Sequence, residues 1–508
     1  MMEKLHPIMF AGTGSDVGKS VIAAAFCRIF LQDGYKPAPF KAQNMALNSF
    51  ATPDGLEIGR AQAVQAEAAG IDCCTDMNPL LLKPNSDHTS QVVLNGRPVG
   101  NSSAYDYFRR NGRDHLRSEV QAAYDRLSRR HNPIVMEGAG SISEINLRDT
   151  DIVNMPMAMH AGADVVLVGD IDRGGVFASV YGSIMLQRPE ERKRIKGILI
   201  NKFRGDLRLF DDGRRMLEEL CGVPVLGVIP YFSDIHIEEE DSVALAEKAR
   251  ERMAGRVNVA VVLLRHLSNF TDFDALERDP RVHLFYTANA SDMANADIII
   301  VPGSKSTIDD LCNLRRSGLA KAITDCRRRG ATVVGVCGGY QMMGLEVCDP
   351  CHMESDTERL PGLALLPVST TMTTKKTTRQ RHFTLYGDHT GEKQHGEQHM
   401  MTGYEIHMGE THIAEDSAAR PLAVLDDGTT DGCWVDDHCF GTYLHGIFDN
   451  GEFVDRLLAP YADKLNAAPT FDYAEYKNTQ YDLLADHVRR HVDMERIYSI
   501  LKSDETKC

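Results

Sequence analysis

Short apolar runs alternate with longer amphipathic stretches through the first half of the chain. The runs are rich in Val, Ile and Leu and occupy residues 7–11, 134–137, 164–169, 198–201 and 225–229. Apolar runs without an alternating polar face are typical of strands buried on both faces, and the stretches between them are long enough for crossover helices. The pattern predicts an α/β fold built on a parallel sheet with helices on both faces.

A second series of apolar runs follows a charged segment at residues 237–256. These runs lie at residues 257–264, 282–286, 296–303 and 331–336. We therefore expect two α/β domains, residues 1–250 and 251–508, with a boundary near residue 250. Residues 370–399 are rich in Thr, Lys, His and Gly and are predicted to form an exposed hairpin or loop rather than core.

Composition argues against a membrane-spanning, an exported or a nucleic-acid-binding protein. The 508 residues include 43% hydrophobic and 25% charged residues, with no run of about 18 apolar residues that would span a bilayer. The first ten residues lack the features of a signal peptide, so we expect a cytoplasmic protein whose 12 cysteines are reduced thiols. The formal charge of −16 argues against nucleic acid as a partner. The sequence does not indicate an oligomeric state.

A glycine-rich loop follows the first predicted strand and precedes a predicted helix. Glycines let backbone N–H groups surround phosphate oxygens, a lysine neutralises the outer phosphates, and a hydroxyl reaches Mg²⁺. The residues predicted to bind ATP are Gly12, Thr13, Gly14, Ser15, Asp16, Val17, Gly18, Lys19 and Ser20. Because Thr13 stands where the usual spacing has glycine, the loop is one residue longer and resembles that of dethiobiotin synthetase and its relatives.

Four side chains are candidate Mg²⁺ ligands. Ser20 follows the loop lysine, and Glu137 ends an apolar strand at the sheet edge where ligands of open α/β sheets bind. The alternative for Glu137 is a helix N-cap or a surface acid. Glu57 is a weaker candidate, as is Asp16 within the loop.

A cysteine lies between a predicted strand and a predicted helix in the second series. Cys337 in G-V-C-G-G has the form of a nucleophile elbow, which exposes the thiol at a helix N-terminus and lowers its pKa. His445 in Y-L-H-G is the expected general base. The backbone N–H groups of Gly338 and of the Gly303 turn are expected to form an oxyanion hole.

Two metal-site patterns are rejected. Cys348, Cys351 and His352 have the C-x-x-C-H spacing of haem attachment, but that chemistry belongs to exported proteins. His395, His399 and His407 lie in or beside a polar stretch and are expected to be solvated rather than zinc ligands.

The motifs together resemble the cobyric acid synthase family over nearly the full length. The shared segments are K-A-Q-N-M-A-L-N-S at 41–49, E-I-G-R-A-Q at 57–62, G-D-I-D-R-G-G-V-F-A-S at 169–179, I-N-K-F-R-G-D at 200–206, S-N-F-T-D-F-D at 268–274, V-P-G-S-K-S-T at 301–307, G-V-C-G-G-Y-Q-M-M-G at 335–344, G-Y-E-I-H-M-G at 403–409 and Y-L-H-G at 443–446, in addition to the phosphate loop. The resemblance implies a dethiobiotin-synthetase-like ATP domain fused to a class I glutamine amidotransferase domain of flavodoxin-like fold.

The same resemblance implies the reaction and its partners. It implies glutamine-dependent and ATP-dependent amidation of the b, d, e and g carboxylates of adenosylcobyrinic acid a,c-diamide, with ATP and Mg²⁺ as cofactors and L-glutamine and a corrinoid as substrates. Cys337 and His445 match the glutaminase nucleophile and base. Many class I glutaminases have a glutamate two residues after this histidine, but this chain has Ile447, so the orienting member of the triad is missing from its usual place. Either Cys337 and His445 act as a dyad or another group orients the ring.

Substrate contacts are expected at five further residues. Lys41, Gln43 and Asn44 belong to the first family segment, and Asp149 and Asp151 follow Glu137 in N-L-R-D-T-D. For the two aspartates, an ordinary loop cap is an equally good interpretation.

Two other functions remain open at this point. A cobyrinic acid a,c-diamide synthase would share the two-domain plan and amidate the a and c carboxylates instead. A nucleotide-switched ATPase or scaffold of the deviant phosphate-loop type would carry a degenerate glutaminase domain used only for binding.

Overall fold

The first series of apolar runs forms one parallel sheet in the computed structural model, which describes residues 3–84, 89–103, 113–238, 251–387, 400–465 and 469–502. In spatial order the strands are β12 (Val225–Pro230), β11 (Ile195–Phe203), β10 (Asp164–Asp170), β1 (Ile8–Gly12), β9 (Ile134–Glu137) and β2 (Ala38–Phe40). Every residue of β1 and β10 is buried, as expected for central strands covered on both faces. The predicted strands and their parallel arrangement are confirmed.

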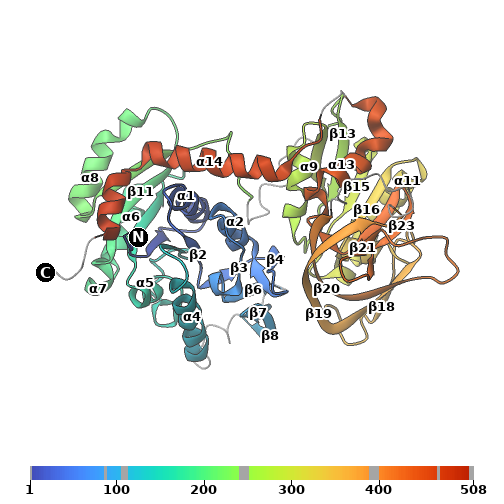
Figure 1. Ribbon diagram of the computed structural model, residues 1–508, viewed down its shortest axis with the longest axis horizontal. Coiled ribbons are helices and arrows are strands. Elements are labelled where there is room, and N and C mark those ends of the chain that lie inside the picture. Colours follow the sequence, from blue (N-terminus) through green and yellow to red (C-terminus); the bar gives the residue numbers. More distant parts are fainter. Residues whose placement is uncertain are drawn as a thin grey trace. The chain divides into compact units, whose positions relative to one another are not determined.

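Helices cover this sheet, and the last helices of the chain take part (Figure 1). They are α1 (Lys19–Gln32), α2 (Arg60–Ala68), α4 (Arg113–Ser128), α5 (Met155–Ala161), α6 (Val176–Met185), α7 (Pro189–Arg192), α8 (Asp211–Cys221), α14 (Tyr473–His491) and α15 (Met494–Lys502). Leu484 and Val488 of α14 share a core cluster with Phe26 of α1 and Val166 of β10. Arg489 of α14 also pairs with Asp33 at 2.7 Å.

A smaller sheet that the sequence pattern did not reveal lies in the same unit. It consists of β3 (Gln43–Met45), β6 (Leu80–Pro84), β7 (Thr89–Leu94) and β8 (Arg97–Ser103), in that order. Two three-residue strands, β4 (Ser49–Ala51) and β5 (Glu57–Gly59), lie between β3 and α2 in the sequence.

The second series of apolar runs forms a second α/β sheet. Its order is β14 (Val282–Thr287), β13 (Val257–Val262), β15 (Ile298–Val301), β16 (Thr332–Val336), β24 (Cys439–Thr442) and β23 (Cys433–Asp436), parallel except at β23. The associated helices are α9 (Asp274–Arg278), α10 (Thr307–Arg316), α11 (Leu319–Arg328), α12 (Gly338–Met343) and α13 (Gly451–Leu458). The predicted strands of this series are confirmed as well.

Residues 370–385 form one strand of an antiparallel pair with residues 401–413, as the hairpin interpretation expected, but this strand is partly buried rather than exposed. They lie in a long strand of a further sheet that contains β18 (Arg359–Pro361), β17 (Glu346–Cys348), β19 (Val368–Leu385), β20 (Met401–Ile413), β25 (Leu444–His445), β21 (Ala423–Leu425) and β22 (Thr430–Asp431). Burial alternates along parts of β19, and Phe383 is fully buried in the core. Adjacent pairs of Thr and the Lys residues beside them hid this strand, because Thr fits a pleated surface as well as a loop. Residues 388–399 lie outside the described residues.

The chain divides into two compact units. The first contains Met1–Ala46, Leu56–Glu238 and Tyr476–Cys508, and the second contains Leu47–Gly55 and Glu239–Glu475. The division differs from a single boundary near residue 250 at two segments, residues 47–55 and the C-terminal helices. The predicted boundary itself adjoins residues 239–250, which lie outside the described residues. Among the described helices, none is long and apolar enough to cross a membrane.

Candidate functional sites

The predicted phosphate loop connects β1 to α1 in the first unit. Asp16 and Gly18 have positive φ values of 57° and 94°, which turn the loop around its own backbone. Lys19 folds back over it, and its Nζ donates hydrogen bonds to the carbonyl oxygens of Gly14 at 2.8 Å and Gly140 at 3.0 Å. The side chain is therefore held over the concave face of the loop.

A cavity of about 610 Å³ opens beside this loop. Thr13, Gly14 and Ser15 form one wall, and α6 and residues 140–144 contribute the others. Burial lowers the pKa of Lys19 to about 8. The nearby carboxylate of Glu137 opposes this shift only in part, because the ammonium of Lys41 offsets some of its attraction. An anionic ligand in the cavity would raise this pKa again, because it favours the charged form of Lys19.

Glu137 lies at the carboxyl end of β9 and is almost fully buried. Its carboxylate accepts hydrogen bonds from Ser20 Oγ at 2.7 Å, Lys41 Nζ at 2.9 Å and Gln65 Nε2 at 2.7 Å. Burial alone would raise the pKa of Glu137, but the lysine ammonium and the other donors outweigh it and hold that pKa below its ordinary value. The sequence interpretation placed Ser20 and Glu137 together but missed Gln65, which no motif singled out.

The hydroxyl of Ser20 and the carboxylate of Glu137 fit a magnesium ion. Mg²⁺ prefers oxygen ligands and completes its octahedron with water and phosphate oxygens, so two protein ligands suffice. Among the described residues, no group of three or more His, Cys, Asp or Glu side chains is arranged around a common metal position.

Glu57 has a different partner from the one expected. It is buried, and its Oε1 accepts a hydrogen bond from Lys83 Nζ at 2.7 Å. Glu137 has a buried lysine partner of the same kind, and Glu57 as a metal ligand stays a prediction.

The predicted substrate-binding residues are dispersed. Asn44 is buried in β3, where its amide donates to Gln62 Oε1 at 3.2 Å, whereas Gln43 is half-buried. Asp149 is largely exposed, 3.8 Å from Arg188.

Asp151 makes the contacts of a loop cap. Its Oδ1 accepts from the backbone N–H groups of Val153 at 2.7 Å and Asn154 at 3.1 Å. These bonds match the loop-cap interpretation, and contact of either aspartate with substrate stays a prediction.

Cys337 forms a strained turn between β16 and α12 in the second unit. Its φ of 51° and ψ of −112° lie outside the regions that L-residues favour. The helix must start close to the neighbouring strand, because a Cβ at Gly339 would lie 1.8 Å from the carbonyl oxygen of Val301. The small residues after Cys337 therefore allow the approach that a nucleophile elbow requires.

His445 is fully buried in β25 beside this turn. Its Nδ1 lies 2.6 Å from Asp272 Oδ2, and the thiol of Cys337 is a further hydrogen-bond partner of the ring. Burial alone would lower the pKa of His445, but Asp272 and Cys337 outweigh it and raise that pKa to about 10. The predicted nucleophile and base thus lie together, with a carboxylate on Nδ1 of the ring.

Asp272 contacts His445 as the orienting glutamate of the expected triad would, whereas the usual position of that glutamate holds Ile447. It lies in the short 3₁₀ helix Phe270–Phe273, 173 positions before His445, and its Oδ1 also accepts from Gly446 N at 3.1 Å. The sequence pattern did not identify Asp272, because the orienting carboxylate of many class I glutaminases lies two residues after the histidine. One signal was present, since Asp272 follows β13, and the carboxyl ends of neighbouring parallel strands converge on one edge of a sheet.

The two predicted oxyanion-hole turns lie at the same place. A Cβ on Gly303 would be 3.7 Å from His445 Cε1, and one on Gly338 would be 2.9 Å from the backbone nitrogen of Ser304. The two turns therefore lie close to each other and to His445, and their backbone N–H groups as oxyanion-hole donors stay a prediction.

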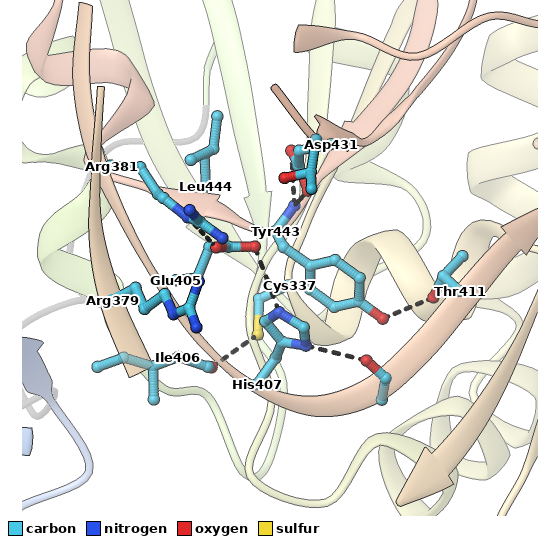
Figure 2. A network of polar contacts seen from close by, with 12 residues as sticks. Cys337, Arg379, Arg381, Glu405, Ile406, His407, Thr411, Asp431, Tyr443 and Leu444 are labelled. Atoms are coloured by element: carbon cyan, nitrogen blue, oxygen red, sulfur yellow. Dashed lines mark hydrogen bonds and ion pairs between the residues drawn. The ribbon is translucent and has the colours of Figure 1, made fainter. Parts of the chain in front are cut away.

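A polar network lines the site on the side of β20 (Figure 2). The ring of His407 stacks on Tyr443 with centroids 3.8 Å apart, and its Nε2 lies 3.5 Å from Glu405 Oε1. Tyr443 in turn accepts from Gln341 Nε2 at 3.1 Å, and Cys337 Sγ lies 3.6 Å from the carbonyl oxygen of Ile406. His407 thus has a packed position next to the thiol, and His395 and His399 lie outside the described residues.

Comparison with known proteins gives consistent matches across the chain. Residues 8–243 match the CobQ/CobB/MinD/ParA nucleotide binding domain, and residues 258–453 match the CobB/CobQ-like glutamine amidotransferase domain. A protein named cobyric acid synthase from Bacteroides fragilis is 68% identical over 99% of this chain and 100% of its own length. One with the same name from Phocaeicola vulgatus is 65% identical over the same shares. Among solved structures, PurLQS from Thermotoga maritima aligns with 41% of this chain and 99% of its own at 16% identity and a TM-score of 0.32.

Proposed function

Because the chain belongs to the cobyric acid synthase family of glutamine-hydrolysing ligases, we propose that it amidates the b, d, e and g carboxylates of adenosylcobyrinic acid a,c-diamide with ATP and glutamine. The observation that carries this proposal is the buried constellation of Cys337, His445 and Asp272, which has the partners of a thiol nucleophile and its base. The lysine-covered loop in the nucleotide-binding domain supplies the other half of the chemistry.

The glutaminase steps follow from this geometry. The Cys337 thiolate attacks the side-chain carbonyl carbon of glutamine, and backbone N–H groups of Gly303 and Gly338 stabilise the oxyanion. His445 gives its proton to the departing nitrogen, so that ammonia leaves and a thioester forms. Water activated by the neutral imidazole then hydrolyses the thioester to glutamate, while Asp272 holds the ring in one orientation.

The synthetase steps require an activated acid, since a carboxylate is a poor electrophile. The terminal phosphoryl group of ATP passes to a carboxylate oxygen of the corrinoid and ADP leaves. Lys19 offsets negative charge on the phosphoryl group. Ser20 and Glu137 would hold Mg²⁺, which when bound offsets further charge on the phosphates. Ammonia then attacks the acyl carbon and inorganic phosphate departs, leaving the amide.

Lys41 contacts a predicted Mg²⁺ ligand and is also a predicted substrate-binding residue. Its ammonium contacts the Glu137 oxygen that also accepts from Ser20, so a cation bound there would displace it. We propose that the freed ammonium then faces the substrate acid, with Gln43 and Asn44 on the same segment.

The direct test is turnover of the a,c-diamide with glutamine, ATP and Mg²⁺, followed by the mass of the product. Addition of four amides supports the proposal. Addition to substrate that lacks the a and c amides would instead identify an a,c-diamide synthase. A nucleotide-switched scaffold would hydrolyse no glutamine.

A second test separates release of ammonia from glutamine and ATP-dependent amide synthesis. Cys337→Ala should abolish glutamine-driven synthesis and leave synthesis with added ammonia, because only nitrogen release needs the thiol. Cys326→Ala, a buried cysteine of α11, is the matched control and should retain both activities. Equal loss with both nitrogen donors in the Cys337 variant would refute the assignment.

A further inference from the structure

A short segment from the N-terminal half of the sequence forms part of the glutaminase unit. Residues Leu47–Gly55 belong to the second unit, where β4 packs against β19 and β20. Asn48 and Ser49 are 0% and 1% exposed. In addition, Gln380 Nε2 donates to the carbonyl oxygen of Ala51 at 2.7 Å. The segment is therefore built into this unit rather than laid on its surface.

The segment holds the turn that precedes Asp272. Ser49 N donates to Asn269 Oδ1 at 3.0 Å, and Asn48 Oδ1 accepts from Phe270 N at 3.2 Å. Asn269 has a φ of 52°, a strained conformation that needs such support. Its Nδ2 lies 3.4 Å from both ring nitrogens of His445. The orientation of this amide against the imidazole thus depends on the backbone of Ser49.

The segment also contacts a second neighbour of the imidazole. Phe50 packs against Tyr404 with ring centroids 4.6 Å apart and an interplanar angle of 61°. Tyr404 stacks on His445 with centroids 5.2 Å apart and an angle of 21°. Its hydroxyl lies 3.5 Å from the carbonyl oxygen of Ser49. Two side chains that contact the ring are therefore both held by residues 49 and 50.

We propose that residues 48–50 are a positioning element of the glutaminase, which holds Asn269 and Tyr404 against His445 and so fixes the ring for proton transfer to and from Cys337. This inference rests on the proposed glutaminase function of Cys337 and His445. Proton transfer depends on placement, and a displacement of about 1 Å can reduce a rate by roughly a hundredfold. The glutaminase is accordingly incomplete without chain from the nucleotide-binding half of the sequence.

The chain that leads into residues 48–50 comes from the first unit. Lys41, whose ammonium contacts Glu137, precedes Ser49 by eight positions, and Ala46 N donates to Leu82 O at 3.1 Å in the first unit. The chain that steadies His445 thus begins among residues that contact the predicted Mg²⁺ ligands.

The test replaces contacts of the segment and leaves every residue of the proposed chemistry in place. Phe50→Ala removes the ring against Tyr404, Asn48→Ala removes the acceptor for Phe270 N, and Phe50→Tyr keeps an aromatic ring as a rescue. Phe232→Ala, which removes a half-buried ring paired with His487 in the first unit, is the matched control. The measurements on the full chain are glutaminase kcat and KM, the pH profile of glutaminase kcat, ammonia-driven synthesis and the thermal midpoint.

We expect the two alanine variants of the segment to lower glutaminase kcat by roughly tenfold to a hundredfold, with a smaller change in KM for glutamine and an altered pH profile. Ammonia-driven synthesis should be unchanged, and Phe50→Tyr and Phe232→Ala should retain glutaminase kcat. Wild-type kcat in both alanine variants overturns the proposal, as does a parallel loss of both activities with the thermal midpoint. If Cys337→Ala still uses glutamine, the glutaminase assignment itself fails, which is a separate outcome.

Discussion

Replacement of Asp272 by Asn tests whether this carboxylate orients and charges the glutaminase histidine. The new amide would keep an oxygen for Gly446 N but lose the negative charge 2.6 Å from His445 Nδ1. Both members of the pair are buried, with side-chain exposures of 0% for His445 and 3% for Asp272. Solvent therefore screens the lost interaction very little, and breaking such a pair costs about 3–5 kcal/mol.

The expected loss of activity is large. In Ser-His-Asp hydrolases, the equivalent loss of an orienting carboxylate costs on the order of 10⁴ in kcat, because the histidine adopts the wrong tautomer. We expect Asp272→Asn to lower glutaminase kcat by about 10³–10⁴, or roughly 4–5.5 kcal/mol at the transition state. Ammonia-driven synthesis should be retained. Asp274→Asn, the same change two positions along the chain, is the matched control.

The same substitution should change how stability depends on pH. The pKa of His445 is raised from an ordinary 6.5 to about 10, so its contribution to folding is fully present below pH 6.5 and is lost as pH rises from 6.5 to about 10. Without the Asp272 charge that pKa falls toward its ordinary value, and the loss over this window shrinks. The free energy of unfolding in urea at pH 6.5 and at pH 9.5, compared between the variant and the wild type, measures this loss. Wild-type kcat together with an unchanged pH dependence of stability in Asp272→Asn would refute the reasoning.

Three further predictions concern other parts of the chain. Lys19→Met should abolish ATP-dependent synthesis, measured as product mass, but leave glutamine hydrolysis in place; loss of both activities would count against separate sites. Gly339→Ala should destabilise the protein by about 1–3 kcal/mol or more in urea unfolding, because its Cβ would meet Val301 O at 1.8 Å, and an unchanged midpoint would contradict the packing argument. Glu57→Gln should lower stability by removing the carboxylate charge 2.7 Å from the buried ammonium of Lys83, while the Mg²⁺ concentration dependence of synthesis stays the same; a shifted Mg²⁺ requirement would support Glu57 as a metal ligand.

The sequence predicted the parts of the fold that depend on local pattern. Most strands of the two large sheets appeared as continuous apolar runs, since both of their faces are buried, but β2, β23 and β24 were not predicted. The loop before Lys19 and the turn at Cys337 carried recognisable small residues. The strand Val368–Leu385 was missed because its Thr and Lys residues give a weak apolar pattern. Local pattern therefore identifies buried strands and tight turns more reliably than half-exposed ones.

The missed site residues were those brought in from a distance. Asp272 reaches His445 across 173 positions, and Gln65 reaches Glu137 across 72. Neither has a local signature, because a single acid or amide at a helix position is common. Only the convergence of strand ends on one edge of a sheet indicated Asp272, and that rule selects loops rather than residues.

The pKa of Lys19 is lowered and the pKa of His445 is raised, although burial lowers both. The difference lies in the charges that surround each side chain. At His445 the nearest opposite charge is a carboxylate in direct contact, so the cationic form is stabilised in the resting protein and its pKa rises. At Lys19 the attraction of Glu137 is partly offset by Lys41, burial prevails and the pKa falls to about 8. The charge on Lys19 thus lacks a sufficient partner until an anion enters the cavity beside the loop. Nucleotide binding above pH 8 must then take up a proton at this lysine, whereas the imidazole in the other unit needs no ligand to hold its charge.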